Sequence, residues 1–204
     1  MMTLLPLLGA CLAPETVAEA PEDLEPLGAP RSVDWPADDQ ETINLAHEEQ
    51  AEFSYAEGRG VVLADVETVY GCLQEDMVNV NRREAASWEV VEEEPPDGVE
   101  RAYSIPTLVE NLLPVEYTDY WLHGLVGDEG RSRYRMIFGN DFMSYKEGSI
   151  VLTATPDGGG ARLELIGRLE ATARGSDTVA QYLGDVYADA VACAHGEPWP
   201  TFGD

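Results

Sequence analysis

The sequence predicts an α+β domain in which one antiparallel sheet is covered on one face by a long C-terminal helix. Two observations carry this prediction. Seven segments between residues 51 and 172 show the two-residue alternation of strands and are bounded by turn-forming residues. The last helical pattern, from Ser176 to Cys193, is long enough to lie across a sheet. A sheet that buries one face under a helix is a stable α+β arrangement.

The first strand and the helices after it come early in the domain. Residues 51–63 alternate, and Asp65 then stands where its carboxylate can cap a helix. The apolar face of that helix consists of Val66, Val69, Tyr70 and Leu73. A second short helix is expected at 76–84. Two short helices therefore follow the first strand.

The other strands form a hairpin and a series of four. The hairpin joins 87–94 to 98–105, and the four are 115–125, 132–139, 148–155 and 162–172. In the last strand leucines alternate with charged residues, so one face packs and the other is wet. The glycines at 156–160 form the turn before it rather than a phosphate loop, because no P-loop lysine accompanies them.

The closing helix has a single apolar side. Ser176 can cap it, and Gly196 and Pro198 end it. Its stripe consists of Val179, Tyr182, Leu183, Val186, Ala190 and Cys193.

The charge is strongly negative. The 204 residues carry 39 acids and 12 bases, a formal charge of -27, and Lys146 is the only lysine. Such a surface repels phosphate backbones, so nucleic acid is excluded as a partner. The acidity is explained equally well by adaptation to salt or by genomic bias. Cys72 and Cys193 both fall on apolar helix faces, and we expect them to be buried free thiols, with a disulfide between them as the alternative.

The amino terminus carries a candidate lipid-attachment site. Residues 8–11, "LGAC", resemble the lipobox of bacterial lipoproteins, in which the cysteine, here Cys11, is acylated. The apolar run before it is short and lacks a basic residue, so a soluble tail with an incidental cysteine is the alternative. No apolar run approaches the roughly 20 residues of a membrane-spanning helix. Residues 12–40 are acidic and proline-rich, and we expect a disordered tether.

The folded part, 41–197, resembles the START-related superfamily of polyketide cyclases, coenzyme Q-binding proteins and plant allergens. The likeness rests on "VVLADVETVYGCLQED" at 61–76, on "PDGGGARLEL" before the last strand, and on the closing helix. It implies a helix-grip fold, with a curved sheet of seven antiparallel strands wrapped on that helix. It also implies a hydrophobic cavity, typically of about 300 to 1,000 Å³, between them. Residues 198–204 are a short tail.

Aromatic and aliphatic side chains are candidates to line this cavity. They are Tyr117, Trp121, Tyr134, Phe138, Tyr182 and Val186. The alternative for each is ordinary core packing, which demands the same spacing. Asp119 and His123 share a strand face with Tyr117 and Trp121, which would suit general acid–base catalysis if that face is interior. We favour an exterior face, on which the two form a solvated pair.

Three arginines, Arg131, Arg133 and Arg135, share one face of a strand. They neutralise carboxylates on a solvent face, or else meet a phosphate headgroup at the cavity mouth. No spacing of Cys or His indicates a metal site, and no hydrolase, kinase or dinucleotide motif is present. The sequence thus points to no cofactor and no metal.

The sequence favours a monomeric protein of the cell envelope, lipid-anchored or secreted, that binds or transports a hydrophobic small molecule or lipid without turnover. One alternative is a cyclase or aromatase that uses Asp119 and His123. Another is an envelope interaction module whose cavity is filled by side chains. A cytoplasmic location follows if Cys11 is not acylated.

Overall fold

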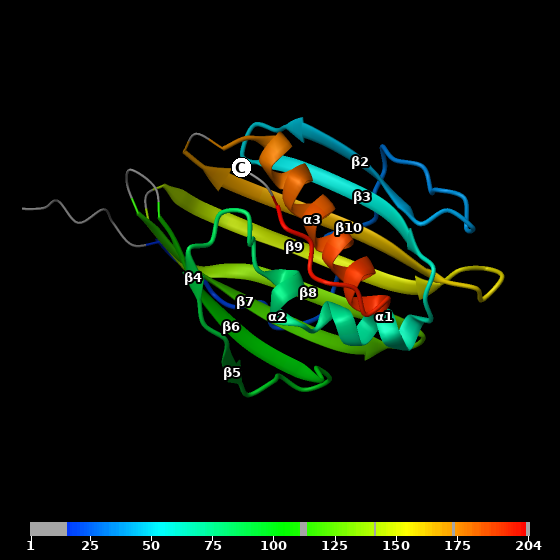
Figure 1. Ribbon diagram of the computed structural model, residues 1–204. Coiled ribbons are helices and arrows are strands. Elements are labelled where there is room, and N and C mark those ends of the chain that lie inside the picture. Colours follow the sequence, from blue (N-terminus) through cyan, green and yellow to red (C-terminus); the bar gives the residue numbers. More distant parts are fainter. Residues whose placement is uncertain (1–15, 111–113, 141, 173, 203–204) are drawn as a thin grey trace, which may run out of the picture.

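The computed structural model describes residues 16–202 except 111–113, 141 and 173, and it has the predicted α+β helix-grip fold (Figure 1). One curved sheet wraps around helix α3 (Ser176–Ala194). Two short helices, α1 (Val66–Leu73) and α2 (Asp76–Asn79), lie beside its C-terminal half. None of the helices in the described part of the chain has the length and apolar character that crossing a bilayer requires.

The described residues form ten strands where seven were expected. They are β1 (Thr16–Val17), β2 (Thr42–Glu49), β3 (Ser54–Val62), β4 (Ser87–Trp88), β5 (Val91–Glu93), β6 (Arg101–Val109), β7 (Val115–Val126), β8 (Glu129–Gly139), β9 (Met143–Ala154) and β10 (Ala161–Ala171). The order across the sheet is β2-β3-β10-β9-β8-β7-β6-β4, with β1 on β8 and β5 on β6. The first arm of the predicted hairpin is split into β4 and β5, and β1 and β2 are additional.

Strand β2 escaped prediction because it lies at an edge of the sheet. Most of its residues are exposed, so the alternation that marks a half-buried strand is weak. It pairs antiparallel with β3, from Thr42 opposite Val61 to Glu49 opposite Ser54. Its far end also reaches the start of α3, where Glu49 accepts a hydrogen bond from the backbone N–H of Ser176.

The helix starts are partly as predicted. Asp65 caps α1 by accepting from the backbone N–H of Thr68 at 2.8 Å, which confirms the prediction. Ser176 begins α3 but does not cap it, because Gly175 occupies the cap position and Glu49 of β2 supplies the acceptor. Helix α2 ends at Asn79, before the predicted 84, where Val80 turns to extended backbone.

Cys72 and Cys193 are joined in a disulfide, so the expectation of free thiols was wrong. The bond links α1 to the last turn of α3 across 121 residues of sequence. Each cysteine does lie on the apolar face of its helix, as predicted. Those faces pack against each other, however. The spacing of residues within each helix could not predict this contact, because the two helices are far apart in the sequence.

Residues 16–40, here called the N-terminal strap, pack across the sheet face that points away from α3, so the prediction of a disordered tether was wrong for them. Leu24 and Val33 are only 6% and 8% exposed. Glu57 accepts from the backbone N–H of Arg31 at 2.9 Å, and Arg59 donates to the carbonyl of Val33 at 2.8 Å. Side chains of the sheet thus satisfy a proline-rich backbone that has little secondary structure of its own. Residues 1–11 lie outside the described part.

The tail also packs on the domain. Arg82 donates to the carbonyl oxygen of Pro200 at 3.1 Å and lies over the rings of Trp199 and Phe202. The main core lies between the concave face of the sheet and α3. This placement decides which side chains of each strand face the interior.

Candidate functional site

The interior face of β7 carries Tyr117, Asp119, Trp121 and His123. Asp119 is 3% exposed and His123 is fully buried, so the expectation of a solvated exterior pair was wrong. Two-residue spacing correctly placed the four side chains on one face. The two bulky aromatic residues commit that face to the core, because burying them stabilises the fold more than burying the opposite face does.

Asp119 forms an ion pair with Lys146 of β9. The alternation of β9 turns Lys146 inward together with Gly148, Ile150 and Leu152. Its ammonium nitrogen lies among three tyrosine rings, 4.9 Å from the centroid of Tyr117, 5.6 Å from Tyr134 and 4.8 Å from Tyr182. The chain's single lysine is therefore buried in a cage of aromatic rings.

Burial and mutual attraction act in opposite directions on this pair. Burial raises the pKa of the Asp119 carboxyl, and the Lys146 ammonium offsets part of that rise. For Lys146, burial favours loss of the proton, but Asp119 and the tyrosines outweigh it and raise the pKa. Lys146 is therefore held as a cation and is a poor nucleophile at neutral pH.

His123 has partners of its own. Its Nδ1 lies 2.8 Å from the Ser132 hydroxyl and its Nε2 lies 3.1 Å from the Tyr103 hydroxyl, which in turn accepts from Asn79. Burial, with a smaller effect from Arg101, lowers the pKa of His123 to about 3, so the ring is neutral. Asp119 and His123 share no hydrogen-bond partner among the described residues, so no relay joins them.

A stack of aromatic rings lies in the core under α3. Tyr103, His123, Trp121 and Tyr134 stack in series, with centroid separations of 5.3, 5.7 and 4.4 Å. Tyr182 of α3 meets Tyr134 edge-on at 6.1 Å. Tyr103, Trp121 and Tyr134 are cross-strand neighbours on β6, β7 and β8, so the sheet itself aligns the stack.

A pocket remains at the end of the stack, near the start of α3. Its volume is about 30 Å³, far below the expected cavity and enough for one or two water-sized groups. Of the side chains predicted to line a ligand cavity, Tyr117, Tyr134 and Tyr182 line this pocket. Trp121 and Val186 lie in the core away from it. The full lining is Asn81, Glu84, Tyr117, Tyr134, Met143, Lys146, Arg168, Leu169, Arg174, Thr178, Val179 and Tyr182.

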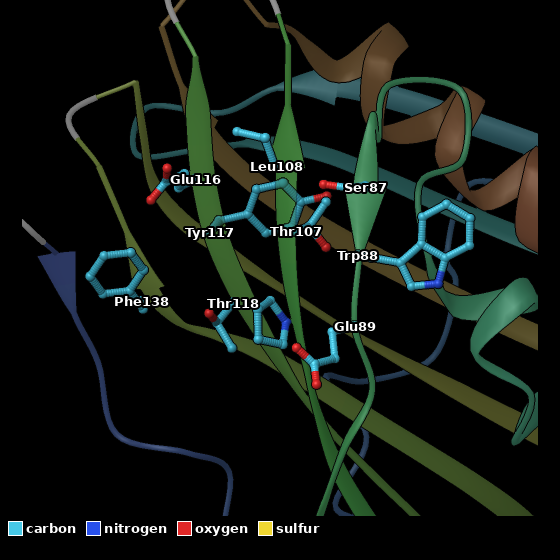
Figure 2. Close-up of a pocket in the computed structure, with 10 residues that line it drawn as sticks. Ser87, Trp88, Glu89, Thr107, Leu108, Glu116, Tyr117, Thr118 and Phe138 are labelled. Atoms are coloured by element: carbon cyan, nitrogen blue, oxygen red, sulfur yellow. The ribbon is translucent and has the colours of Figure 1, made fainter.

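Phe138 lies on the other face of the sheet, so its predicted place in the cavity was wrong. A register shift in the β7–β8 pairing leaves Ile137 unpaired, which reverses the alternation between Met136 and Phe138. Phe138 is therefore opposite Thr118, and both line an open groove of about 470 Å³ at the sheet end (Figure 2). A bulge of this kind leaves no mark in a two-residue pattern.

The three arginines of β8 face away from α3. Arg131 bonds Glu129 at 2.8 Å near the surface, as expected. Arg133 is buried beneath the N-terminal strap and bonds Glu147 at 2.9 Å, and Arg135 reaches the same carboxylate at 3.1 Å. The prediction of a solvent-facing arginine was thus right for Arg131 and wrong for Arg133. None of the three lines the pocket under α3.

Lys146 is the functional candidate that the sequence reasoning missed. The predicted strand began at 148, two residues too late to include it. A single lysine in an acidic chain was a usable signal, because alternation extended back from Ile150 and Gly148 places it inward. Within the described residues, no group of three His, Cys, Asp or Glu side chains is placed to hold a metal ion.

Comparison with solved structures identifies the fold. Human StAR-related lipid transfer protein 5 matches with a TM-score of 0.51 and 12% identity, over 76% of this chain and 82% of that one. A StAR-related lipid transfer protein from Xanthomonas axonopodis matches at 0.47 and 15%, over 78% and 95%. The Zhui aromatase/cyclase from a Streptomyces species matches at 0.45 and 15%, over 75% and 93%. No family model and no curated protein sequence matches the chain.

Proposed function

From the helix-grip fold that the chain shares with the START-related superfamily, we propose that this protein binds an apolar or amphiphilic small molecule without converting it. The site is the pocket between α3 and the concave face of the sheet. The observation that carries the proposal is the buried cation Lys146, which lines the pocket and is ringed by Tyr117, Tyr134 and Tyr182. Its charge is paired with Asp119, which lies outside the lining. A few polar groups inside a mainly apolar and aromatic lining are the usual composition of a ligand site.

Binding a larger molecule requires the pocket to widen, and its rim offers a place for that. Glu84 and Arg174 both line the pocket and form an ion pair at 2.8 Å. Both are partly exposed, so the pair contributes little stability, on the order of 0–1 kcal/mol. Side-chain rearrangement at such a rim commonly accompanies ligand entry. The N-terminal end of α3 also lies away from the disulfide, which fixes the other end of the helix.

A blocking substitution tests the site. Thr178 lies at the pocket on α3, and its neighbour Asp177 is exposed and outside the lining. We expect Thr178→Trp to abolish binding of the fluorescent apolar probe phenylnaphthylamine, while Asp177→Trp leaves it unchanged. Equal binding by both variants and the wild type would place the probe elsewhere and contradict the proposal.

A second candidate function is an interaction module with a filled interior. The ring stack and the pocket volume of about 30 Å³ favour it. It predicts that the wild-type chain binds no apolar probe and carries no small molecule in an organic extract examined by mass spectrometry. A cyclase or aromatase finds less support, because His123 and Asp119 are engaged with separate partners.

The proposed location is the cell envelope, with a lipid on Cys11. Support comes from the lipobox-like residues 8–11 and from the disulfide, since disulfides persist mainly in oxidising compartments. The strap would hold the pocket close to the anchor, because Thr16 pairs with Gly139, whose other partner is Tyr117 of the pocket. Globomycin-sensitive labelling with a fatty-acid probe tests this. Wild type should be labelled and Cys11→Ser should not, and an unlabelled wild type would remove the anchor.

A further inference from the structure

We propose that the open groove at the end of the sheet binds a basic, proline-rich peptide in the polyproline II conformation. The groove has a volume of about 470 Å³, and most of its side chains belong to the sheet face that points away from α3. It is therefore a second site, and this inference does not depend on the function proposed for the pocket under α3. Prolines of the peptide would contact the groove, and its arginines would pair with the carboxylates there.

Two rows of side chains cross the strands at this groove, as Figure 2 shows. In the first row Pro106 lies opposite Thr118, and Thr118 lies opposite Phe138. Glu89 extends this row toward the edge of the sheet, because its backbone N–H donates to the carbonyl oxygen of Pro106 at 3.2 Å. The second row lies two residues further along the same strands and consists of Ser87, Leu108 and Glu116.

The first row has the repeat of a polyproline II helix. Neighbouring strands lie about 4.8 Å apart, so Pro106 on β6 and Phe138 on β8 are separated by about 9.6 Å. A polyproline II helix rises about 3.1 Å per residue, so prolines three positions apart lie on the same side and about 9.3 Å apart. One proline of the peptide can therefore contact Pro106 while another contacts Phe138. Exposed apolar and aromatic rings are the surfaces on which such peptides dock.

The groove also offers hydrogen-bond donors to a peptide backbone. A polyproline II helix has no internal hydrogen bonds, so its carbonyl oxygens accept from groups outside it. Thr118 lies between Pro106 and Phe138 in the first row, and Ser87 lies in the second. Neither hydroxyl has a hydrogen-bond partner among the described residues. Proline has no N–H, so a proline-rich peptide presents acceptors to a groove that presents hydroxyl donors.

Charge decides which kind of proline-rich peptide the groove accepts. Glu89 and Glu116 are exposed on opposite sides of it, and neither has a cationic partner in the part of the chain that the structure describes. The net charge of -27 attracts a basic peptide and repels an acidic one. The N-terminal strap, which is proline-rich and acidic, shows the opposite pairing on the same face, where Arg59 and Arg133 donate to its carbonyl oxygens.

Fluorescence anisotropy of labelled peptides titrated with the full chain tests the inference. The probe is hexaproline with an arginine at each end. One control peptide carries a glutamate at each end instead, and the other keeps the arginines but replaces the prolines by alternating glycine and serine. We expect the probe to bind at least about tenfold more tightly than either control, and added salt should weaken its binding.

Variants of the chain place the peptide in the groove. Glu89→Gln combined with Glu116→Gln should weaken binding of the probe by about fivefold, because each carboxylate pairs with an arginine at an exposed position. Glu52→Gln is the matched control, since Glu52 is an exposed glutamate in the turn between β2 and β3, outside the groove. It should leave the affinity unchanged. All three positions are exposed, so these variants should fold like the wild type.

Four results would overturn the inference. The wild type could fail to bind the probe, or it could bind the glycine-serine peptide as tightly, which would make the groove a site for any cationic chain. Equal binding of the peptide with glutamates would show that the groove carboxylates select nothing. Equal effects of the groove variant and Glu52→Gln would place the peptide elsewhere. Binding of phenylnaphthylamine reports separately on the pocket under α3, so each proposal can fail without the other.

Discussion

Lys146 on β9 and Asp119 on β7 form an ion pair that spans the intervening strand β8 beneath α3. Both side chains are buried. A buried ion pair contributes little net stability, but removing one partner leaves a charge without compensation. Removing either residue alone should therefore destabilise the fold strongly, whereas removing both charges together should cost much less stability.

We predict strong coupling between these two residues. Lys146→Met should lower the free energy of unfolding by about 3–5 kcal/mol, because it strands the Asp119 charge. Adding Asp119→Asn should recover most of that loss. Urea denaturation of the two single variants and the double variant measures the coupling. Losses that simply add would show that the two charges do not stabilise each other.

The disulfide between Cys72 and Cys193 should contribute substantially to stability. It closes a loop of 121 residues, for which restriction of the unfolded chain is worth up to about 5 kcal/mol. We expect Cys72→Ser, Cys193→Ser and the double variant to unfold at similar, lower urea concentrations than the oxidised wild type. Reduction of the wild type should give the same midpoint. Identical midpoints before and after reduction would contradict the bond's role.

Removing the N-terminal strap should destabilise the domain. Burial of Leu24 and Val33 together stabilises the fold by at least about 3 kcal/mol. A chain that starts at Glu41 loses this and also uncovers Glu57. A chain that starts at Thr16 keeps every described contact and serves as the control. If thermal unfolding is the same for the two chains, the strap does not hold the sheet.

Glu147 should make the stability of the fold depend on pH in the acidic range. It is 2% exposed and receives hydrogen bonds from Arg133, Arg135 and Arg168. Burial raises its pKa, but Tyr145 and the arginines outweigh that effect and lower the pKa to about 2, from 4.5. A depressed carboxyl pKa stabilises the fold above pH 4.5, by up to about 3 kcal/mol, and this is lost as the pH falls toward 2.

The matching variant is Glu147→Gln. It should be less stable than wild type at pH 7, and its stability should fall less between pH 4.5 and pH 2. Denaturant unfolding across this range measures both effects. Parallel curves for the two proteins would contradict the assignment.

The sequence predicted correctly those parts of the fold that depend on residues close together in the chain. The alternation in Leu163, Leu165 and Leu169 and the capping carboxylate of Asp65 depend on neighbours in sequence, and the structure has them as expected. The hydrogen bond from the backbone N–H of Ser176, at the start of α3, to Glu49 joins residues 127 positions apart. The edge strand β2 is mostly exposed and therefore shows no clear alternation. No spacing rule carries that information.

The candidate site shows the same division. Periodicity placed Asp119 and Trp121 on one face of the strand, but it did not show on which side of the sheet that face lies. The register shift at Thr118 moved Phe138 out of the interior, and an inward lysine fell just outside the predicted strand. The N-terminal strap was misjudged because composition averages over a segment, whereas a few residues such as Leu24 and Val33 anchor it.

Photocrosslinking of the wild-type chain with a diazirine-bearing long-chain alcohol tests the central claim, that a ligand binds between α3 and the sheet. Mass spectrometry of the digested protein should find adducts on peptides that contain Lys146 or Tyr182, which line the pocket under α3 and not the groove around Trp88 and Phe138. Adducts confined to the outer groove around Trp88 and Phe138, or no adducts at all, would contradict it.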